Sequence, residues 1–196
     1  MKKIYSIALM AVALLLSTGV SAQTKWKVDK GHSNVKFSVQ HMVVSEMEGS
    51  FRMFDGTMEH NKADFSDAKI NFTVDVASVN TDNERRDGHL KSDDFFNAEK
   101  FPKMTFVSTS VKPLGGNKFK ITGNLTIRDV TKSVVFDVTH GGVLKTQNGS
   151  KAGFKARTNI DRFDYNLKWS RTVEAGGLAV GKDVEIVVNV EMDSVQ

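Results

Sequence analysis

The most constraining feature of this sequence is an alternation of apolar and polar residues that recurs along most of its length. Successive side chains of a β-strand point to opposite faces, so a period of two indicates strands with one buried and one solvated face. Such rows occupy 34–41, 68–76, 119–128, 134–138, 152–156 and 184–192, with shorter candidates at 25–28, 48–59 and 104–111. The chain is therefore predicted to be all-β.

The connections between these rows have the composition of tight antiparallel turns. Segments 114–117 (Leu-Gly-Gly-Asn) and 147–150 (Gln-Asn-Gly-Ser) contain Gly and Asn, which tolerate the positive φ that hairpins need. Segment 81–96 breaks the alternation, and Asp-Asn-Glu at 82–84 is suited to cap a short helix. A second irregular stretch is 161–181. We expect antiparallel strands and one or two short helices.

An antiparallel sheet of this size must cover its apolar face and protect its edges. A closed barrel and a two-sheet sandwich both do so, and the alternation does not separate them. Strands of about ten residues favour the barrel, because sandwich strands are commonly nearer five or six. An eight-stranded barrel has room for filler side chains or for one small ligand.

Residues 1–22 have the pattern of an export signal peptide. Two lysines at 2–3 precede the uncharged stretch 4–16, and small residues end at Ala22, before Gln23. The uncharged stretch is shorter than the about 20 residues that span a bilayer, which disfavours the alternative of an uncleaved anchor. We expect cleavage at Ala22/Gln23 and a soluble periplasmic domain over 23–196, with at most transient membrane contact. The sequence leaves a homodimer open.

The chemistry-bearing residues argue for a binding protein rather than an enzyme. There is no Cys and no G-x-S-x-G motif to present a nucleophile. The net charge of +4, without a long basic run, argues against nucleic acid as a partner. None of the five His residues has a metal-binding spacing, so we expect no metal and no cofactor, although a site assembled from distant strands is an alternative. The 13 Phe residues suit either a dry core or a cavity for an apolar chain, and composition alone favours core filling.

Specific strings add a family resemblance that covers nearly all of 25–192. They are 29–33 (Asp-Lys-Gly-His-Ser), 35–41, 49–51, 86–96 (beginning Arg-Asp-Gly-His), 101–106, 123–128, 131–132, 162–165 and 180–184. In this order they resemble the YceI-like, polyisoprenoid-binding family. The sequence departs from the family pattern at Asp129 and Asn166, where Gly is common, but both lie in turns in which Asp or Asn can adopt the left-handed conformation.

The resemblance implies an eight-stranded antiparallel β-barrel of lipocalin-like architecture, exported to the periplasm, that holds an isoprenoid lipid or isoprenoid quinone. Side chains expected to face this lipid are Phe37, Val39, His41, Phe51, Met53, Ile70, Phe72, Val74, Phe106, Ile121, Leu125, Phe136 and Phe154. Arg86, His89 and Arg162 are candidate donors to a polar head group. For Arg86 an ion pair that holds the short helix in place is an equal alternative.

Three functions remain open at this stage. The leading one is a non-catalytic lipid carrier. The second is an accessory to quinone or isoprenoid metabolism, which predicts polar groups with perturbed pKa values around the head group. The third is a stress-related barrel with a filled interior, which predicts no cavity.

Overall fold

The alternating rows form a strongly curved antiparallel sheet. The structure is a computed structural model, and it describes residues 23–173 and 176–195, so the predicted signal peptide and its cleavage site lie outside the described residues. Within this part of the chain the elements are β1 (Thr24–His41), β2 (Ser45–Phe51), β3 (Phe54–His60), β4 (Lys69–Asp75), the 3-10 helix η1 (Val76–Ser78), β5 (Val79–Asn80), α1 (Glu84–Lys91), β6 (Lys103–Gly115), β7 (Lys118–Ile127), β8 (Val130–Thr146), β9 (Gly149–Asp161), the 3-10 helix η2 (Arg162–Tyr165) and β10 (Val180–Val195).

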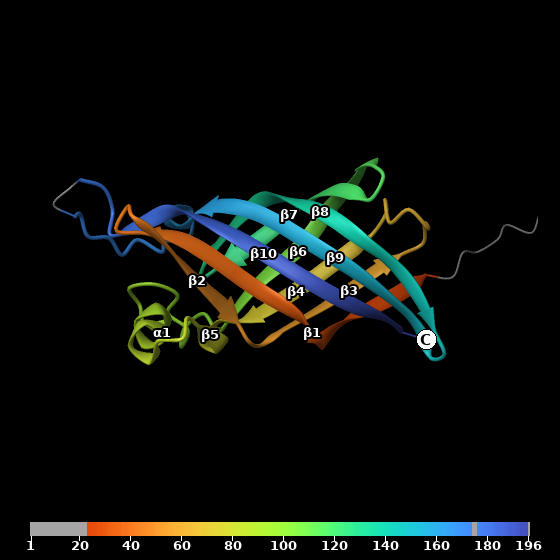
Figure 1. Cartoon of the computed structure of the whole chain (residues 1–196), viewed down its shortest axis with the longest axis horizontal. Coiled ribbons are helices and arrows are strands. Elements are labelled where there is room, and N and C mark those ends of the chain that lie inside the picture. The colour runs from red at the N-terminus through yellow and green to blue at the C-terminus, as the bar shows by residue number, and fades with distance from the viewer. Residues whose placement is uncertain (1–22, 174–175, 196) are drawn as a thin grey trace, which may run out of the picture.

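The sheet closes on itself as an eight-stranded barrel. The ring runs β1-β10-β9-β8-β7-β6-β4-β3 and returns to β1, with every pairing antiparallel. The closing pair, β1 with β10, extends from Lys25↔Val195 to His41↔Val180, with register shifts between Asp29 and Asn34 and between Val39 and His41. Figure 1 shows the strands crossing the long axis obliquely, as barrel closure requires, with α1 and β5 gathered at one end. The predicted lipocalin-like barrel is confirmed, and the sandwich is excluded.

A break between β2 and β3 shifts the alternation. β1 pairs with β3 at its start and with β2 at its end, so β2 and β3 act as one strand interrupted at Arg52 and Met53. Ser78 bridges the break, since its hydroxyl accepts from the Met53 amide at 3.0 Å. Two consecutive residues then face outward, between Phe51 (6% exposed) and Phe54 (8%). Such an interruption moves every later side chain to the other face.

The predicted turns and helix are present. Gly115, Gly116 and Gly149 have the positive φ expected of the two hairpins. Helix α1 begins after Asn83, whose side chain accepts from the Arg86 amide at 3.0 Å. Asn166 is left-handed as predicted (φ 61°), but in the other turn Arg128 (φ 55°), and not Asp129, takes that conformation.

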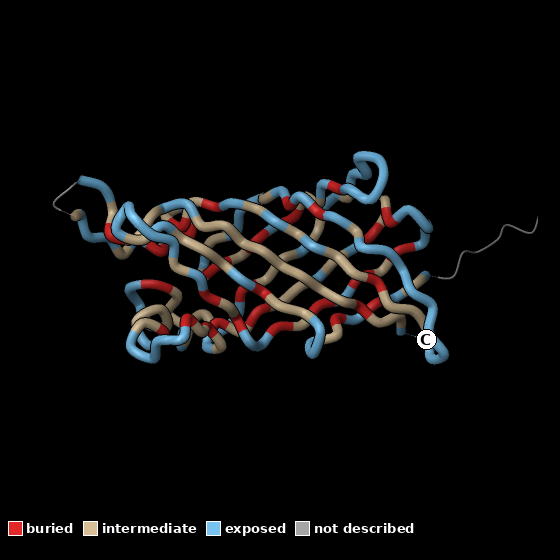
Figure 2. The backbone as a smooth tube through the Cα atoms, in the orientation of Figure 1, coloured by how far each residue is buried: buried red, intermediate tan, exposed pale blue. Residues whose placement is uncertain are grey.

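Burial follows the inner face of the barrel and both of its ends (Figure 2). At the end away from α1, Trp26 is 4% exposed and its indole donates to His60 Nε2 at 2.9 Å. At the α1 end, Tyr165 of η2 is 1% exposed. No helix in the described ranges is both long and apolar enough to cross a bilayer.

Candidate functional site: an apolar barrel interior

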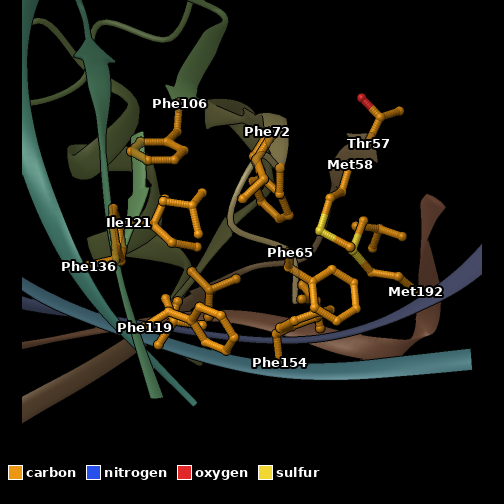
Figure 3. A pocket seen from close by; sticks show the side chains of 18 residues that line it. Thr57, Met58, Phe65, Phe72, Phe106, Phe119, Ile121, Phe136, Phe154 and Met192 are labelled. Carbon is orange, nitrogen blue, oxygen red and sulfur yellow. The ribbon is translucent and has the colours of Figure 1, made fainter. Parts of the chain in front are cut away.

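The interior of the barrel holds two cavities that share part of their walls. The first, of about 120 Å³, lies toward the end that carries Phe65, and its lining also includes Met58, Phe119, Phe154 and Met192 (Figure 3). The second, of about 140 Å³, lies toward α1. Phe72, Phe106, Phe136 and Val188 line both cavities. The two cavities are therefore neighbours, separated by aromatic side chains.

Most of the side chains predicted to face a lipid do line these cavities. The residues in the walls are Phe37, Val39, Phe51, Ile70, Phe72, Val74, Phe106, Ile121, Leu125, Phe136 and Phe154. They come from β1, β2, β4, β6, β7, β8 and β9, so the predicted register of these strands is correct. A wall of this composition offers apolar contact area and few hydrogen-bonding groups.

Two of the predicted lipid contacts are misplaced. Met53 is 61% exposed, because it lies in the break between β2 and β3 where the alternation shifts. His41 is absent from the described lining of both cavities. His41 is the last residue of β1, two residues beyond Val39 in the wall of the second cavity, and its pairing with β2 stays regular as far as His41↔Ser45.

The walls also contain residues that the sequence analysis did not single out. β10 contributes Val184, Ile186 and Val188 to the second cavity and Val188, Val190 and Met192 to the first. Their alternation could have identified them, since all five lie in one predicted row. Phe65, Leu90, Phe95, Phe96 and Leu167 come from segments outside the strands, where no periodicity marks an inward face.

The Arg-Asp-Gly-His string fixes helix α1 to the barrel. Asp87 is 9% exposed, and its Oδ1 accepts from the amide of Thr81 at 2.8 Å and from its hydroxyl. Arg86 donates through Nε to the Thr81 hydroxyl and through Nη2 to the Thr81 carbonyl, both at 2.7 Å. Arg86 thus holds the helix in place, as the alternative interpretation proposed, but it does so through hydrogen bonds to Thr81 and not through the expected ion pair.

Two further side chains bind the segment after α1. His89 Nε2 lies 2.8 Å from Asp94 Oδ2, and its ring meets those of Phe95 and Trp169 edge to face at 5.0 and 5.4 Å. Arg128, which the sequence analysis did not select, donates to the carbonyls of Asp93, Phe95 and Asn166. These contacts keep the aromatic side chains of this segment over the second cavity.

Arg162 is the only one of the three predicted head-group donors in the described lining of a cavity. It is 3% exposed, and burial lowers the pKa of its guanidinium, an effect that Asp161 partly opposes. Its N–H groups donate to four backbone carbonyls, those of Gly181 (2.8 Å), Val180 (2.9 Å), Trp169 (2.8 Å) and Leu167. The guanidinium therefore organises the chain from η2 to β10.

The opposite end is closed by the loop between β3 and β4. Phe65 has φ 59°, which is unusual for an aromatic residue, and its ring packs against those of His60, His140 and Phe154 at 4.5 to 5.6 Å. Asp67 anchors the loop by accepting from the amide of Lys62 at 3.0 Å. This backbone hydrogen bond is the largest cause that lowers the Asp67 pKa to about 2, with further contributions from Asn61.

A polar cluster lies on the outer face, away from the cavities. The ligand atoms of Asp29, His32 and Glu191 lie within 4.8 Å of one another. The ammonium of Lys151 lies between their carboxylates, 3.2 Å from Asp29 and 2.8 Å from both Glu191 and Asp193. Hydrogen bonds from His32 and Lys151 lower the Asp29 pKa to about 2. The cluster already contains its own cation and functions as an ion-pair network linking β1, β9 and β10.

Comparison with known proteins agrees with this architecture. The sequence profile of the YceI-like domain matches residues 26–192. The chain belongs to the YceI-like family. A curated YceI-like relative is UPF0312 protein SAS2572 of Staphylococcus aureus (strain MSSA476), which is 39% identical over 170 residues that cover 86% of this chain and 96% of that protein.

Several solved structures superpose over most of the chain. The YCEI protein of Campylobacter jejuni has a TM-score of 0.69 at 33% identity, covering 86% of this chain and 97% of that one. BcnA of Burkholderia cenocepacia has a TM-score of 0.73 at 27% identity, covering 84% and 98%. A polyisoprenoid binding domain from Saccharophagus degradans has a TM-score of 0.65 over 87% and 98%, and at 15% identity it shows that the fold is shared.

Proposed function

We propose that this chain is a non-catalytic periplasmic binding or carrier protein for an apolar isoprenoid-type lipid held inside the barrel. The observation that carries the proposal is the pair of adjoining cavities, whose walls are built from apolar and aromatic side chains of the barrel strands. The motif resemblance to the polyisoprenoid-binding family points to the same ligand class. The signal-peptide pattern of residues 1–22 supports the periplasmic location.

The energetics suit such a ligand. Burying one methylene-sized group contributes roughly 0.8 kcal/mol, so a prenyl chain gains affinity with each unit that leaves water. The described lining of the first cavity contains a single polar residue, Thr57, whose hydroxyl points away from the cavity in Figure 3. A hydrocarbon chain leaves no polar group unsatisfied in such a wall, whereas a polar ligand would lose hydrogen bonds to water.

A filled barrel is the second candidate, and one observation favours it. Each cavity is of a volume comparable to an engineered cavity of roughly 150 Å³ that holds a benzene molecule. Neither cavity alone accommodates a long isoprenoid chain. Binding of such a chain therefore requires both cavities and movement of the side chains between them. An isoprenoid quinone would meet the same requirement with its tail.

Native mass spectrometry of the protein purified from its own periplasm tests the proposal. We expect a stoichiometric adduct that is released by organic extraction and identified as a prenyl compound. Identification of the adduct as an isoprenoid quinone would favour the accessory role in quinone metabolism. A protein that is isolated empty and that also fails to bind added isoprenoids of several lengths would contradict the proposal and support the filled barrel.

A further inference from the structure

The boundary between the two cavities is formed by three aromatic rings. Phe72 of β4 and Phe106 of β6 are cross-strand partners, and Phe106 meets Phe136 of β8 edge to face with centroids 5.1 Å apart. All three line both cavities. Figure 3 shows the three side chains on neighbouring parts of the wall, directed toward the lumen. Any chain that occupies both cavities must pass these rings.

Glycine residues let two of these rings lie close to the barrel wall. Gly56 of β3 is the cross-strand partner of Phe72, and a Cβ at Gly56 would lie only 2.5 Å from Phe72 Cδ2. A Cβ at Gly123 of β7 would lie 2.4 Å from Phe106 Cζ. Contacts this short do not occur with real Cβ atoms, so both rings rest where a side chain would otherwise be. The space that these glycines leave free increases the width of the passage.

The position of Phe72 is fixed from the other sides as well. Its ring stacks on that of Phe54, with centroids 5.9 Å apart and an interplanar angle of 15°. A Cβ at Gly56 would also meet Val28 Cγ2 at 3.0 Å. With Phe54 and Val28 already packed, a methyl group at Gly56 leaves the Phe72 ring little room except toward the lumen.

We propose that Phe72, Phe106 and Phe136 form a gate between the two cavities, and that Gly56 and Gly123 set its width, so that the protein selects prenyl chains by length. This inference rests on the proposed function. A prenyl chain that is short enough for a cavity of about 120–140 Å³ fills one cavity and leaves the gate in place. A long chain occupies both cavities, and it binds because the rings of Phe72 and Phe106 can lie flat against the glycine backbone.

The test compares geraniol, a short prenyl alcohol, with solanesol, a long one, on delipidated wild-type protein and on Gly56→Ala. Displacement of a fluorescent fatty probe reports both affinities. We expect Gly56→Ala to bind geraniol as wild type does and to bind solanesol about tenfold more weakly, or ~1.4 kcal/mol. Gly153→Ala is the matched control, because Gly153 lies in β9 with open space around its Cβ position, and it should bind both alcohols normally.

A rescue variant separates narrowing of the gate from general damage to the fold. Gly56→Ala combined with Phe72→Leu removes the displaced ring and should restore solanesol binding. If Gly56→Ala does not fold, Phe106→Leu serves instead, since a wider gate should speed solanesol association much more than geraniol association.

The outcomes distinguish this inference from the proposed function. If wild type binds neither alcohol, the proposed function fails. If wild type binds both alcohols, lipid binding stands, and the variants then decide about the gate. The gate is wrong if Gly56→Ala leaves both affinities at the wild-type values or lowers both to the same extent. It is also wrong if Phe106→Leu leaves the rate of solanesol association unchanged.

Discussion

Arg162 is the residue for which a structural role and a ligand-binding role predict the most different results. Its guanidinium is buried and donates to the carbonyls of Leu167, Trp169, Val180 and Gly181. Arg162→Met keeps much of the side-chain volume and removes all of these hydrogen bonds. If the guanidinium organises this end of the barrel, the variant must be strongly destabilised whether or not lipid is bound.

The expected magnitude follows from the number of carbonyls left without a donor. A hydrogen bond from a charged donor contributes roughly 1.5–3 kcal/mol, but some of the freed carbonyls will bind water. A buried acceptor left without its donor costs about 1–3 kcal/mol, so with water replacing some of the donors we expect a total loss of about 3–5 kcal/mol. With a urea m-value of about 2–3 kcal/mol/M, the unfolding midpoint should fall by about 1–2.5 M.

Urea unfolding of delipidated protein, followed by tryptophan fluorescence and circular dichroism, measures this loss. Arg157→Met is the matched control, because Arg157 is 54% exposed and lies 3.8 Å from Glu185, so its removal should change the stability by less than about 0.5 kcal/mol. A midpoint for Arg162→Met that matches this control would refute the structural account. Normal stability together with loss of a bound lipid would instead make Arg162 a head-group donor.

Three further predictions concern the cavity wall and two carboxylates. Phe72→Asp should abolish retention of lipid in native mass spectra without unfolding the protein, because it places a charge in an apolar wall, and failure to fold would favour the filled barrel. The Asp67 pKa is lowered from 3.8 to about 2, so the Asp67 carboxylate stabilises the fold above about pH 4 and this contribution is lost as the pH falls toward 2. Asp67→Asn should therefore flatten the acidic part of a plot of unfolding free energy against pH, measured by urea unfolding. The His32 pKa is raised by the hydrogen bond to Asp29, so its contribution is full below the ordinary value of 6.5 and is lost as the pH rises through the raised pKa. NMR titration should show the His32 pKa return toward 6.5 in Asp29→Asn, and an unchanged value would disprove the pairing.

The sequence predicted the barrel wall well because the period of a strand is tied to its faces. Once Phe72 and Phe136 were assigned to inward rows, their neighbours two residues away were determined too. Prediction failed where that period is interrupted. Met53 lies in the break between β2 and β3, and nothing in its own residue type marks a shift of one position. His41 lies at the end of β1, and alternation alone does not show where along a strand a cavity ends.

The closures of the barrel ends could not be derived in the same way. Phe65 enters the first cavity from a loop whose left-handed backbone is stabilised by contacts with residues far away in the sequence, such as His140 and Phe154. Arg86 and Arg162 were predicted as head-group donors, whereas their partners in the structure are backbone carbonyls and a Thr hydroxyl, which leave no pattern in the sequence. Cationic residues near an apolar cavity suggested a head group when their partners were still unknown.

The distribution of polar groups determines what kind of selectivity this interior can have. The charged groups near the α1 end bind the protein's own chain. Hydrogen bonds to backbone carbonyls come from Arg86, Arg128 and Arg162, and Asp87 accepts from Thr81. These bonds hold in place the segments that close this end of the barrel. The walls between the two ends are almost entirely carbon. Recognition by hydrogen bonding needs unpaired donors or acceptors facing the ligand, and discrimination by such groups is stronger than discrimination by apolar contact. This interior can therefore distinguish ligands by their size and shape. The feature that does so is the width of the passage beside Phe72, Phe106 and Phe136.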